Sequence, residues 1–539
     1  MRDRRAWAYG WVGVVSVALA ASGCGWLLGL DEFVDAPPVV DGQGGSGGGC
    51  EPREAVGCYE GPAGTEGVGI CAAGTRTCNA DGTGYGACED QATPAAETCA
   101  NPADEDCDGH DCVLWARMFG DINNQQVTGM ALDREGNIYV TGRFNGTLAF
   151  DPAKPLESVG TDDAYLAKLT ASGAPLWSKA FPHIHTTGVI TDSQGNVILS
   201  GVFKGSLSFG GATHETTGDV QEAAFVARFK PDGAFSWSEM YENGEERTYV
   251  VSPAVDPSDA VILFGRGYCT QICGLPAERL WLRRYRADGT LDWSKNFPYS
   301  DSGGERHATG VTTDSEGNIV LTGSFGGPYG SPSTSFGGPD LTTAGGADAF
   351  LVKLTSQGDF VWQRRYGDSD DQRGMAVACD SAGNILVAGT YAGAMQFGNK
   401  LLSSAGMDDI FVAKLSGAGG ILWARSFGSP EDESVPRLAA QDNGSVVLTA
   451  RTMGPIDFDG GELDGAGGLE MPLVKLAPDG AHIWSKVFGD AADQVSQAVV
   501  VAPGGEVVLA GDAAGAVNLG GIELFSTGGS DVLITRLAR

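Results

Sequence analysis

A pattern of short apolar stretches and polar turns recurs from about residue 113 to the C-terminus. Apolar segments such as IYVTG, VILSG and IVLTG are followed by segments such as DAYLAKL, AAFVARF and DAFLVKL, and glycine-containing turns separate them. Runs of β-branched and aromatic residues bounded by turn residues predict β-strands rather than helices. The pattern therefore predicts an all-β architecture of many short strands.

One tryptophan marks each repeat of this pattern. Seven of them follow one another at intervals of about 60 residues: Trp115, Trp177, Trp237, Trp293, Trp362, Trp423 and Trp484. Between two successive tryptophans the chain has room for four short strands with tight connections. Four antiparallel strands per repeat of this length are typical of a blade of a β-propeller.

The two ends of the repeat region are complementary fragments. The last repeat stops at Leu537 without a tryptophan strand, whereas the first tryptophan strand, residues 114–119, has no three strands before it. Together the fragments make one whole blade. We therefore expect the N-terminal strand to complete the last blade, which removes the open sheet edges. The prediction is a seven-bladed β-propeller over residues 113–539.

The turn after the first strand of most repeats carries an aspartate and, three residues later, a glycine. In GMALDREGN, Asp133 is expected to accept hydrogen bonds within the turn, and Gly136 to adopt the positive φ that such a turn requires. The third repeat departs from the pattern, because DPSDA replaces the turn.

These repeats resemble the SBBP-type β-propeller repeats found in exported bacterial proteins. The resemblance rests on the D-x-x-G-N turn, the DAFLVKL strand and the tryptophan strand, and it covers about residues 113–539. It implies a propeller and fixes no activity.

The N-terminus has the pattern of an export signal. Three arginines among the first five residues precede an apolar core, which ends in small residues before Cys24. This resembles a bacterial lipobox, which implies a signal peptide over residues 1–23 and lipidation of Cys24. An uncleaved membrane anchor is the alternative, since residues 6–30 carry no charge.

Both interpretations place the mature chain outside the cytoplasm and anchor it to the cell envelope. Gly25 stands where the enterobacterial signal for inner-membrane retention has Asp, so the resemblance favours the outer membrane. Residues 24–49 end in a glycine-rich segment and are expected to form a flexible tether.

Residues 50–112 contain few large apolar residues and are expected to form a small disulfide-rich module. Export favours disulfides over zinc, and no Cys-x-x-Cys pair occurs. Eight cysteines allow about 105 pairings, so the connectivity stays open. These eight are Cys50, Cys58, Cys71, Cys78, Cys88, Cys99, Cys107 and Cys112. Cys269 and Cys273 are a further candidate pair in a loop, and Cys379 is expected to be buried and free.

The formal net charge is −33, which opposes binding to nucleic acid, because phosphate contacts need a cationic face. Cations or basic partners fit this charge better. Acidic residues gather in the connections that leave the tryptophan strands, and a propeller places these connections on one rim around the channel mouth. The candidates for a binding rim are Glu245, Asp301, Asp368, Asp371, Glu431 and Asp490. The alternative is that they cap turns on a solvated surface.

One local motif suggests a metal. Asp104, Asp106 and Asp108 alternate and are followed by Gly109, as at the start of a calcium loop. The twelfth position, which carries a bidentate Glu in such loops, is occupied by Trp115. A calcium site and an acidic turn tied by disulfides are therefore the two interpretations.

Signals of catalysis are sparse. The chain has no G-x-S-x-G elbow, phosphate loop or H-E-x-x-H helix, and His183 and His185 lack an evident third metal ligand. The first hypothesis is a monomeric, non-enzymatic envelope lipoprotein, whose propeller binds a protein or polysaccharide or acts as a scaffold. The alternative is an extracytoplasmic hydrolase or lyase with a carboxylate site at the channel mouth. A third hypothesis assigns recognition to the cysteine-rich module.

Overall fold

The computed structural model describes residues 49–101, 103–160, 162–217, 221–242, 247–269, 277–297, 305–327 and 333–539. The expected signal peptide, Cys24 and nearly all of the tether lie outside these residues. So do Cys273, Glu245 and Asp301, as does the side chain of Cys269. All regular structure in the described residues is β-strand. Accordingly, none of these residues belongs to a helix long and apolar enough to cross a membrane.

The repeat region is a seven-bladed β-propeller, as predicted, and every blade is an antiparallel sheet. The innermost strands, in blade order, are β4 (Gln125–Leu132), β10 (Ile184–Thr191), β16 (Arg247–Val250) with β17 (Ala254–Val255), β21 (Glu305–Thr313), β27 (Gln372–Cys379), β33 (Ser434–Ala440) and β39 (Gln494–Val501). The second strands are β5 (Ile138–Phe144), β11 (Val197–Phe203), β18 (Val261–Cys269), β22 (Ile319–Gly326), β28 (Ile385–Tyr391), β34 (Val446–Arg451) and β40 (Val507–Ala513).

The outer half of each blade contains the two strands with the most regular sequences. The third strands are β8 (Asp163–Leu169), β14 (Ala223–Phe229), β19 (Ala277–Tyr285), β25 (Ala347–Leu354), β31 (Asp409–Leu415), β37 (Met471–Leu476) and β43 (Asp531–Leu537). The outermost tryptophan strands are β9 (Pro175–Phe181), β15 (Phe235–Tyr241), β20 (Leu291–Phe297), β26 (Phe360–Tyr366), β32 (Ile421–Phe427), β38 (His482–Phe488) and β3 (Val113–Phe119).

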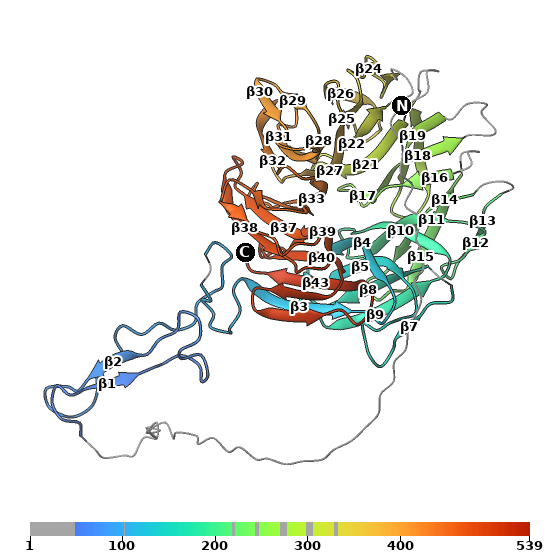
Figure 1. Ribbon diagram of the computed structural model, residues 1–539. Helices are drawn as coiled ribbons and strands as arrows, with labels where there is room; N and C mark the ends of the chain where they lie inside the picture. The colour runs from blue at the N-terminus through green and yellow to red at the C-terminus, as the bar shows by residue number, and fades with distance from the viewer. Residues whose placement is uncertain are drawn as a thin grey trace, which may run out of the picture. The chain divides into compact units, whose positions relative to one another are not determined.

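The seventh blade closes the ring in the predicted way. Strand β3 pairs with β43, so that Trp115 lies opposite Arg536 and Ala116 opposite Thr535. Figure 1 shows the blue strand β3 beside the red strand β43. The first and last strands of the propeller therefore belong to one sheet.

Within the described residues, six blades carry an additional two-stranded hairpin between their second and third strands, where the sequence suggested only a variable loop. Strands this short lack a detectable alternation of apolar and polar residues. The hairpins are β6 (Thr147–Leu148) with β7 (Leu156–Glu157), β12 (Ser206–Leu207) with β13 (His214–Glu215), β23 (Ser333–Thr334) with β24 (Leu341–Thr342), β29 (Ala394–Phe397) with β30 (Lys400–Ser403), β35 (Ile456–Asp457) with β36 (Glu462–Leu463), and β41 (Ala516–Leu519) with β42 (Ile522–Phe525).

The recurrent aspartate–glycine turn has the expected geometry. Asp133 accepts hydrogen bonds from the amides of Glu135 (3.1 Å) and Asn137 (2.9 Å), and Gly136 has a φ of 77°. In the third blade, Asp256 takes the role of Asp133, and Asp259 takes the positive φ, at 61°. Aspartate tolerates this left-handed region better than most residues, which explains how DPSDA replaces the glycine turn.

The regular cations and tryptophans hold neighbouring blades together. Lys414 pairs with Asp380 of its own blade (2.9 Å) and donates to the carbonyl of Gly444 in the next blade (2.8 Å). Trp362 likewise donates its indole N–H to the carbonyl of Gly417 in the next blade, at 3.2 Å. These residues therefore belong to the scaffold.

The N-terminal cysteines form four disulfides: Cys50–Cys78, Cys58–Cys88, Cys71–Cys107 and Cys99–Cys112. Two short strands, β1 (Ala55–Cys58) and β2 (Gly74–Thr77), form a two-stranded sheet. The chain divides into two compact units. The described residues 49–55 and 77–86 belong to the first, and residues 56–76 and 87–539 to the second.

Within the second unit, the last disulfide packs directly on the propeller. Cys99 and Cys112 share a buried apolar cluster with Leu537. The Ala538 amide donates to the Cys112 carbonyl at 2.8 Å, and Lys486 pairs with Asp111 at 2.8 Å. The segment that precedes β3 is therefore held against the seventh blade.

Candidate functional site

Two of the predicted rim carboxylates lie inside turns. Asp368 accepts hydrogen bonds from the Asp370 amide (2.9 Å), the Gln372 side chain (2.7 Å) and the Ala394 amide (2.9 Å). Burial raises the pKa of Asp368, but these hydrogen bonds outweigh it and the pKa lies below its usual value. Asp490 makes the same three kinds of contact in the seventh blade. Their oxygens are used to shape the connection between blades.

Asp371 and Glu431 have a different setting. Asp371 accepts from the Ala347 amide (2.9 Å) and pairs with Arg373 (2.5 Å), and its side chain is 43% exposed. Glu431 is exposed, and within the described residues its carboxylate accepts no hydrogen bond. These two carboxylates remain accessible to a partner.

A further carboxylate, which the sequence analysis missed, faces Arg373 from the next loop. Asp408 lies 3.5 Å from the guanidinium and is 35% exposed. Burial raises the pKa of Asp408; Arg373 counteracts this, whereas the charges of Asp432 and Asp371 add to it. Asp408 follows a hairpin that the sequence did not predict, so no spacing linked it to Asp371.

The central channel contains a cavity of about 690 Å³, lined by the innermost strands. Its walls consist of small aliphatic residues and hydroxyl groups, including Thr128, Thr187 and Thr309. Among the described residues that line it, none is a carboxylate and Arg437 is the one charged group. The predicted rim carboxylates do not reach into this cavity.

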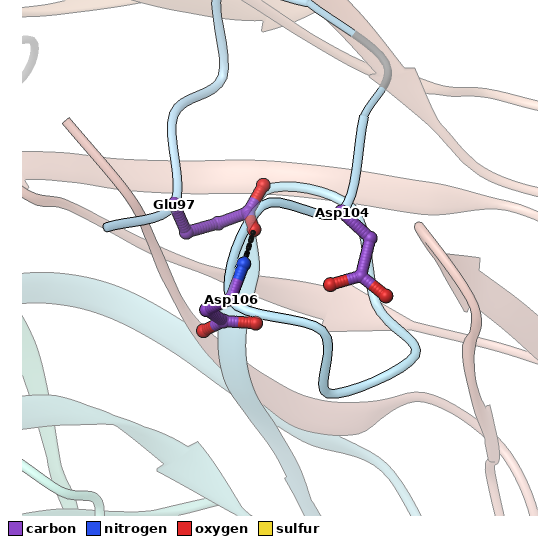
Figure 2. A group of neighbouring side chains, drawn as sticks. All are labelled: Glu97, Asp104 and Asp106. Atoms are coloured by element: carbon purple, nitrogen blue, oxygen red, sulfur yellow. Dashed lines mark hydrogen bonds between the residues drawn. The ribbon is translucent and has the colours of Figure 1, made fainter. Parts of the chain in front are cut away.

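The calcium motif brings together two of its three aspartates. Glu97, Asp104 and Asp106 each offer a carboxylate oxygen, and these oxygens lie within 4.8 Å of one another (Figure 2). Asp108 is not in the group; its carboxylate accepts the His110 amide at 2.9 Å. Glu97 takes the third place. It lies outside the motif, so the spacing gave no signal for it.

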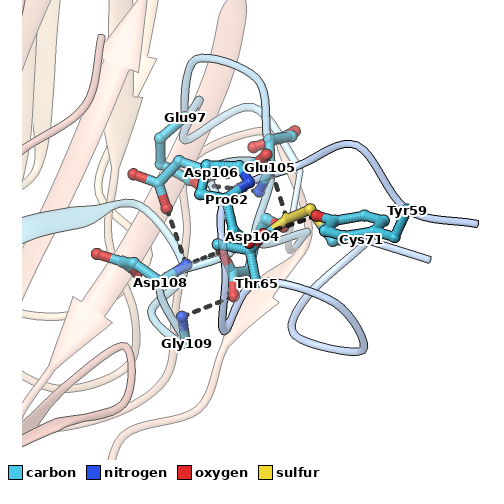
Figure 3. The surroundings of a disulfide bond; sticks show 11 residues. Tyr59, Pro62, Thr65, Cys71, Glu97, Asp104, Glu105, Asp106, Asp108 and Gly109 are labelled. Atoms are coloured by element: carbon cyan, nitrogen blue, oxygen red, sulfur yellow. Dashed lines mark hydrogen bonds between the residues drawn. A yellow bond between two sulfur atoms is a disulfide. The ribbon is translucent and has the colours of Figure 1, made fainter. Parts of the chain in front are cut away.

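The loop that carries this group is tightly organised. The Glu97 carboxylate accepts from the amides of Glu105 (2.9 Å), Asp106 (3.2 Å) and Cys112 (3.2 Å). The Cys71–Cys107 disulfide lies beside it (Figure 3). Burial raises the pKa of both Glu97 and Asp106, and the charges of Asp108 and Asp104 raise that of Asp106 further. Three carboxylates in this arrangement suit a hard cation such as Ca²⁺.

Comparisons with known proteins identify the repeat. Residues 114–148 match the SBBP beta-propeller repeat family. The chain is 28% identical over 429 residues to an uncharacterized WD repeat-containing protein of Acanthamoeba polyphaga mimivirus, covering 64% of this chain and 31% of that protein. It is 27% identical over 165 residues to the regulatory protein FlaEY of Caulobacter vibrioides, covering 29% and 17%. The chain thus spans less than a third of the length of these relatives.

Solved structures with similar folds have low sequence identity to this chain. The Dos1 propeller has a TM-score of 0.39 and 8% identity, covering 77% of this chain and 93% of that structure. A polysaccharide lyase described as an ulvan lyase has a TM-score of 0.43 and 11% identity, covering 77% and 97%. Similarity at this level concerns the fold alone.

Proposed function

We propose that this chain is a non-enzymatic, lipid-anchored protein of the cell envelope, and that its propeller binds a protein or polysaccharide partner through the rim. Four disulfides indicate an oxidising environment outside the cytoplasm. The proposed anchor is Cys24, in the outer membrane. The proposed molecule is a monomer, and its net charge of −33 argues against nucleic acid as the partner.

The observation that carries the binding role is the accessibility of the rim carboxylates. Asp371 is 43% exposed and Glu431 is exposed, so both are solvated. General acid–base catalysis usually relies on carboxylates whose pKa is shifted by burial in a cleft. A solvated acidic rim instead suits a partner with basic or cation-bridged groups.

The rim is tested by neutralising these two accessible carboxylates. The double variant Asp371→Gln and Glu431→Gln is compared with the full chain in a binding screen of envelope proteins and glycans on biosensor tips. We expect the affinity for the captured partner to fall by about tenfold, because two charge contacts are lost. Equal affinity would contradict a role for the rim.

The matched control is the double variant Glu462→Gln and Glu523→Gln, which removes the same charge from two exposed hairpin positions. It should bind like the unaltered chain.

The alternative, a hydrolase or lyase, has one observation in its favour. Burial raises the pKa of Asp408, and Asp408 shares Arg373 with Asp371, so two carboxylates lie close to one guanidinium. In the same screen, release of reducing ends or unsaturated sugars that is abolished by Asp408→Asn would replace the binding role with a catalytic one.

A further inference from the structure

Arg437 differs from the residues at its position in the other blades. Five other blades have the same bulge in the innermost strand, and the residue that resumes pairing after it is Gly129, Gly188, Gly310, Ala376 or Ala498. In the sixth blade, Arg437 resumes the pairing, opposite Thr449. One wall of the channel therefore presents a guanidinium where the others present little or no side chain.

The Arg437 side chain crosses the channel wall toward the seventh blade. Its Nε donates to the Gln497 carbonyl at 3.2 Å, and Nη1 donates to the Pro436 carbonyl at 3.4 Å. A guanidinium has five N–H donors. These two contacts fix the orientation of the guanidinium plane. They leave the donors on Nη2 without an acceptor among the described residues. Among the described residues that line the 690 Å³ cavity, Arg437 is the charged one.

A second arginine lies on the neighbouring strand. Arg451 ends β34, opposite Ser434 of β33, and its Nε is buried without a hydrogen-bond partner in the described part of the chain. Removal from water and the charge of Arg451 lower the pKa of Arg437 to about 10. A buried donor without a partner is costly, and two adjacent cations repel each other. Their coexistence calls for an anion.

Within the described residues, the protein balances this charge only in part. Asp512 is the carboxylate close to Arg451, and it is already engaged by the Val127 amide (2.6 Å) and the Gln497 side chain (2.9 Å). Within the described residues neither Arg437 nor Arg451 forms an ion pair, whereas the nearby Arg143 pairs with Asp162 at 3.2 Å. The two arginines thus keep positive charge that Asp512 offsets only in part, since it pairs directly with neither of them.

We propose that the channel is a binding site for a small hydroxylated carboxylic acid, such as an acidic sugar, whose carboxylate contacts Arg437 with Arg451 adding its charge. The guanidinium fork matches a carboxylate. Thr128 and Thr187 line the same cavity; their hydroxyls bond to Thr186 (2.9 Å) and Ser200 (3.0 Å), and each keeps acceptor capacity for a ligand hydroxyl. A dianion such as phosphate fits less well, because each added negative charge is repelled by the net charge of −33.

The site lies in the channel and goes beyond the rim function, since none of the rim carboxylates lines it. Its volume is in the usual range for small-molecule sites, about 300–1,000 Å³. The two roles can therefore succeed or fail separately.

The test is calorimetric titration of the full chain in detergent with glucuronate, and with glucose, sulfate and inorganic phosphate in parallel. We expect saturable binding of glucuronate, no binding of glucose and weaker binding of the inorganic anions. Arg437→Gly installs the residue that three other blades tolerate at this position, and it should weaken glucuronate binding by about tenfold or more. Glucose binding as tightly as glucuronate, or a preference for phosphate, would overturn the carboxylate assignment.

Two further variants serve as a second test and as a control. Arg451→Gln should also weaken glucuronate binding, and it provides a second test if Arg437→Gly unfolds at a lower temperature than the unaltered chain. Lys400→Gln removes one positive charge from an exposed hairpin position and should bind normally. Unchanged affinity in both arginine variants would refute the site. The rim double variant should bind glucuronate normally, which separates this proposal from the rim function.

The pH dependence offers an independent readout. Burial raises the pKa of Asp512 to about 6, while Arg451 and Arg143 act in the opposite direction. The other groups that face Asp512 are the Val127 amide, Gln497 and Tyr165. Protonation of Asp512 removes a competing negative charge, so glucuronate should bind more tightly at about pH 5 than at about pH 8. Asp512→Asn should abolish most of this difference.

Discussion

At the residue scale, Asp380 shows how one carboxylate joins two blades. It accepts from the amides of Ala382 and Asn384 and pairs with Lys414, which in turn contacts Gly444 of the next blade. Burial raises the pKa of Asp380, but hydrogen bonds from Asn384 and Lys414 outweigh it, so the pKa lies below its usual value. Both side chains of this ion pair are nearly inaccessible to water: Lys414 is 4% exposed and Asp380 is 1% exposed.

Replacing Asp380 by Asn should destabilise the propeller by about 3 kcal/mol, because Lys414 stays buried without a counter-charge. The folded-state pKa of Asp380 is below its unfolded value of about 4, so its stabilisation is present above that pH and is lost as the pH falls further. Urea unfolding should show the full loss of unfolding free energy at about pH 7 and a smaller loss at about pH 3.

The control for this variant is Asp442→Asn, at an exposed position in the next blade. It should leave the urea midpoint unchanged. A variant at Asp380 with the unaltered midpoint at neutral pH would show that the pair contributes nothing.

At the level of single residues, the sequence predicted the scaffold better than it predicted the candidate site. The role of Asp133 and Gly136 follows from local turn chemistry, so it could be predicted. Arg437 and Glu97 could not, because their significance depends on neighbours that only strand register and loop closure bring near. Asp368 was predicted as a binding residue because it is acidic, whereas its carboxylate oxygens accept hydrogen bonds from the backbone of the turn.

At the scale of elements, the segment before β3 links the disulfides to the propeller. Removing the Cys99–Cys112 disulfide by a double substitution to Ser should lower the unfolding free energy of the propeller by about 2–4 kcal/mol. The loss arises because this disulfide packs with Leu537 and fixes the segment that β3 continues. Near-ultraviolet circular dichroism of the tryptophans during thermal unfolding would measure it.

The matched control is the double substitution of Cys50 and Cys78, which belong to the other compact unit. It should leave the unfolding of the propeller unchanged. Equal losses in both double variants would mean that the packing of Cys99 and Cys112 has no special role.

The acidic loop at Glu97, Asp104 and Asp106 retains its calcium interpretation as a prediction. Titration of the full chain with CaCl₂ should give saturable binding, because a cation relieves the repulsion that raises the pKa of Asp106. Asp106→Asn should weaken it by about tenfold. The control is Glu89→Gln, which removes one negative charge from an exposed position outside the ligand group. Absence of binding would leave a disulfide-tied acidic turn.

Element boundaries explain why some of the fold was predicted and some was not. The strand pattern of a blade recurs with a fixed period, so the number of blades and the ring closure followed from counting. The six hairpins consist of strands of two to four residues, and such strands carry no periodic signal. The disulfide pairing depends on how the chain folds back on itself, and this does not appear in the spacing of the cysteines.

At the scale of the whole molecule, the sign of the charge differs between the surface and the channel. The chain is strongly acidic, and its accessible rim carboxylates share that sign. The channel wall at Arg437 has the opposite sign. An acidic ligand would therefore pass a repulsive rim before reaching a cationic interior, which favours small ligands of low charge over polyanions.

The shared blade of β3 and β43 also orders events in time. Thr535 donates a hydrogen bond to the carbonyl of Trp115, across 420 residues of sequence. Strand β3 emerges long before β43 as the chain is exported, so its pairing edge stays unpaired while the other blades form. Contacts of such range are slow to establish. The ring can thus close only after β43 has emerged, and a chain truncated before Asp531 would leave β3 without its partner strand.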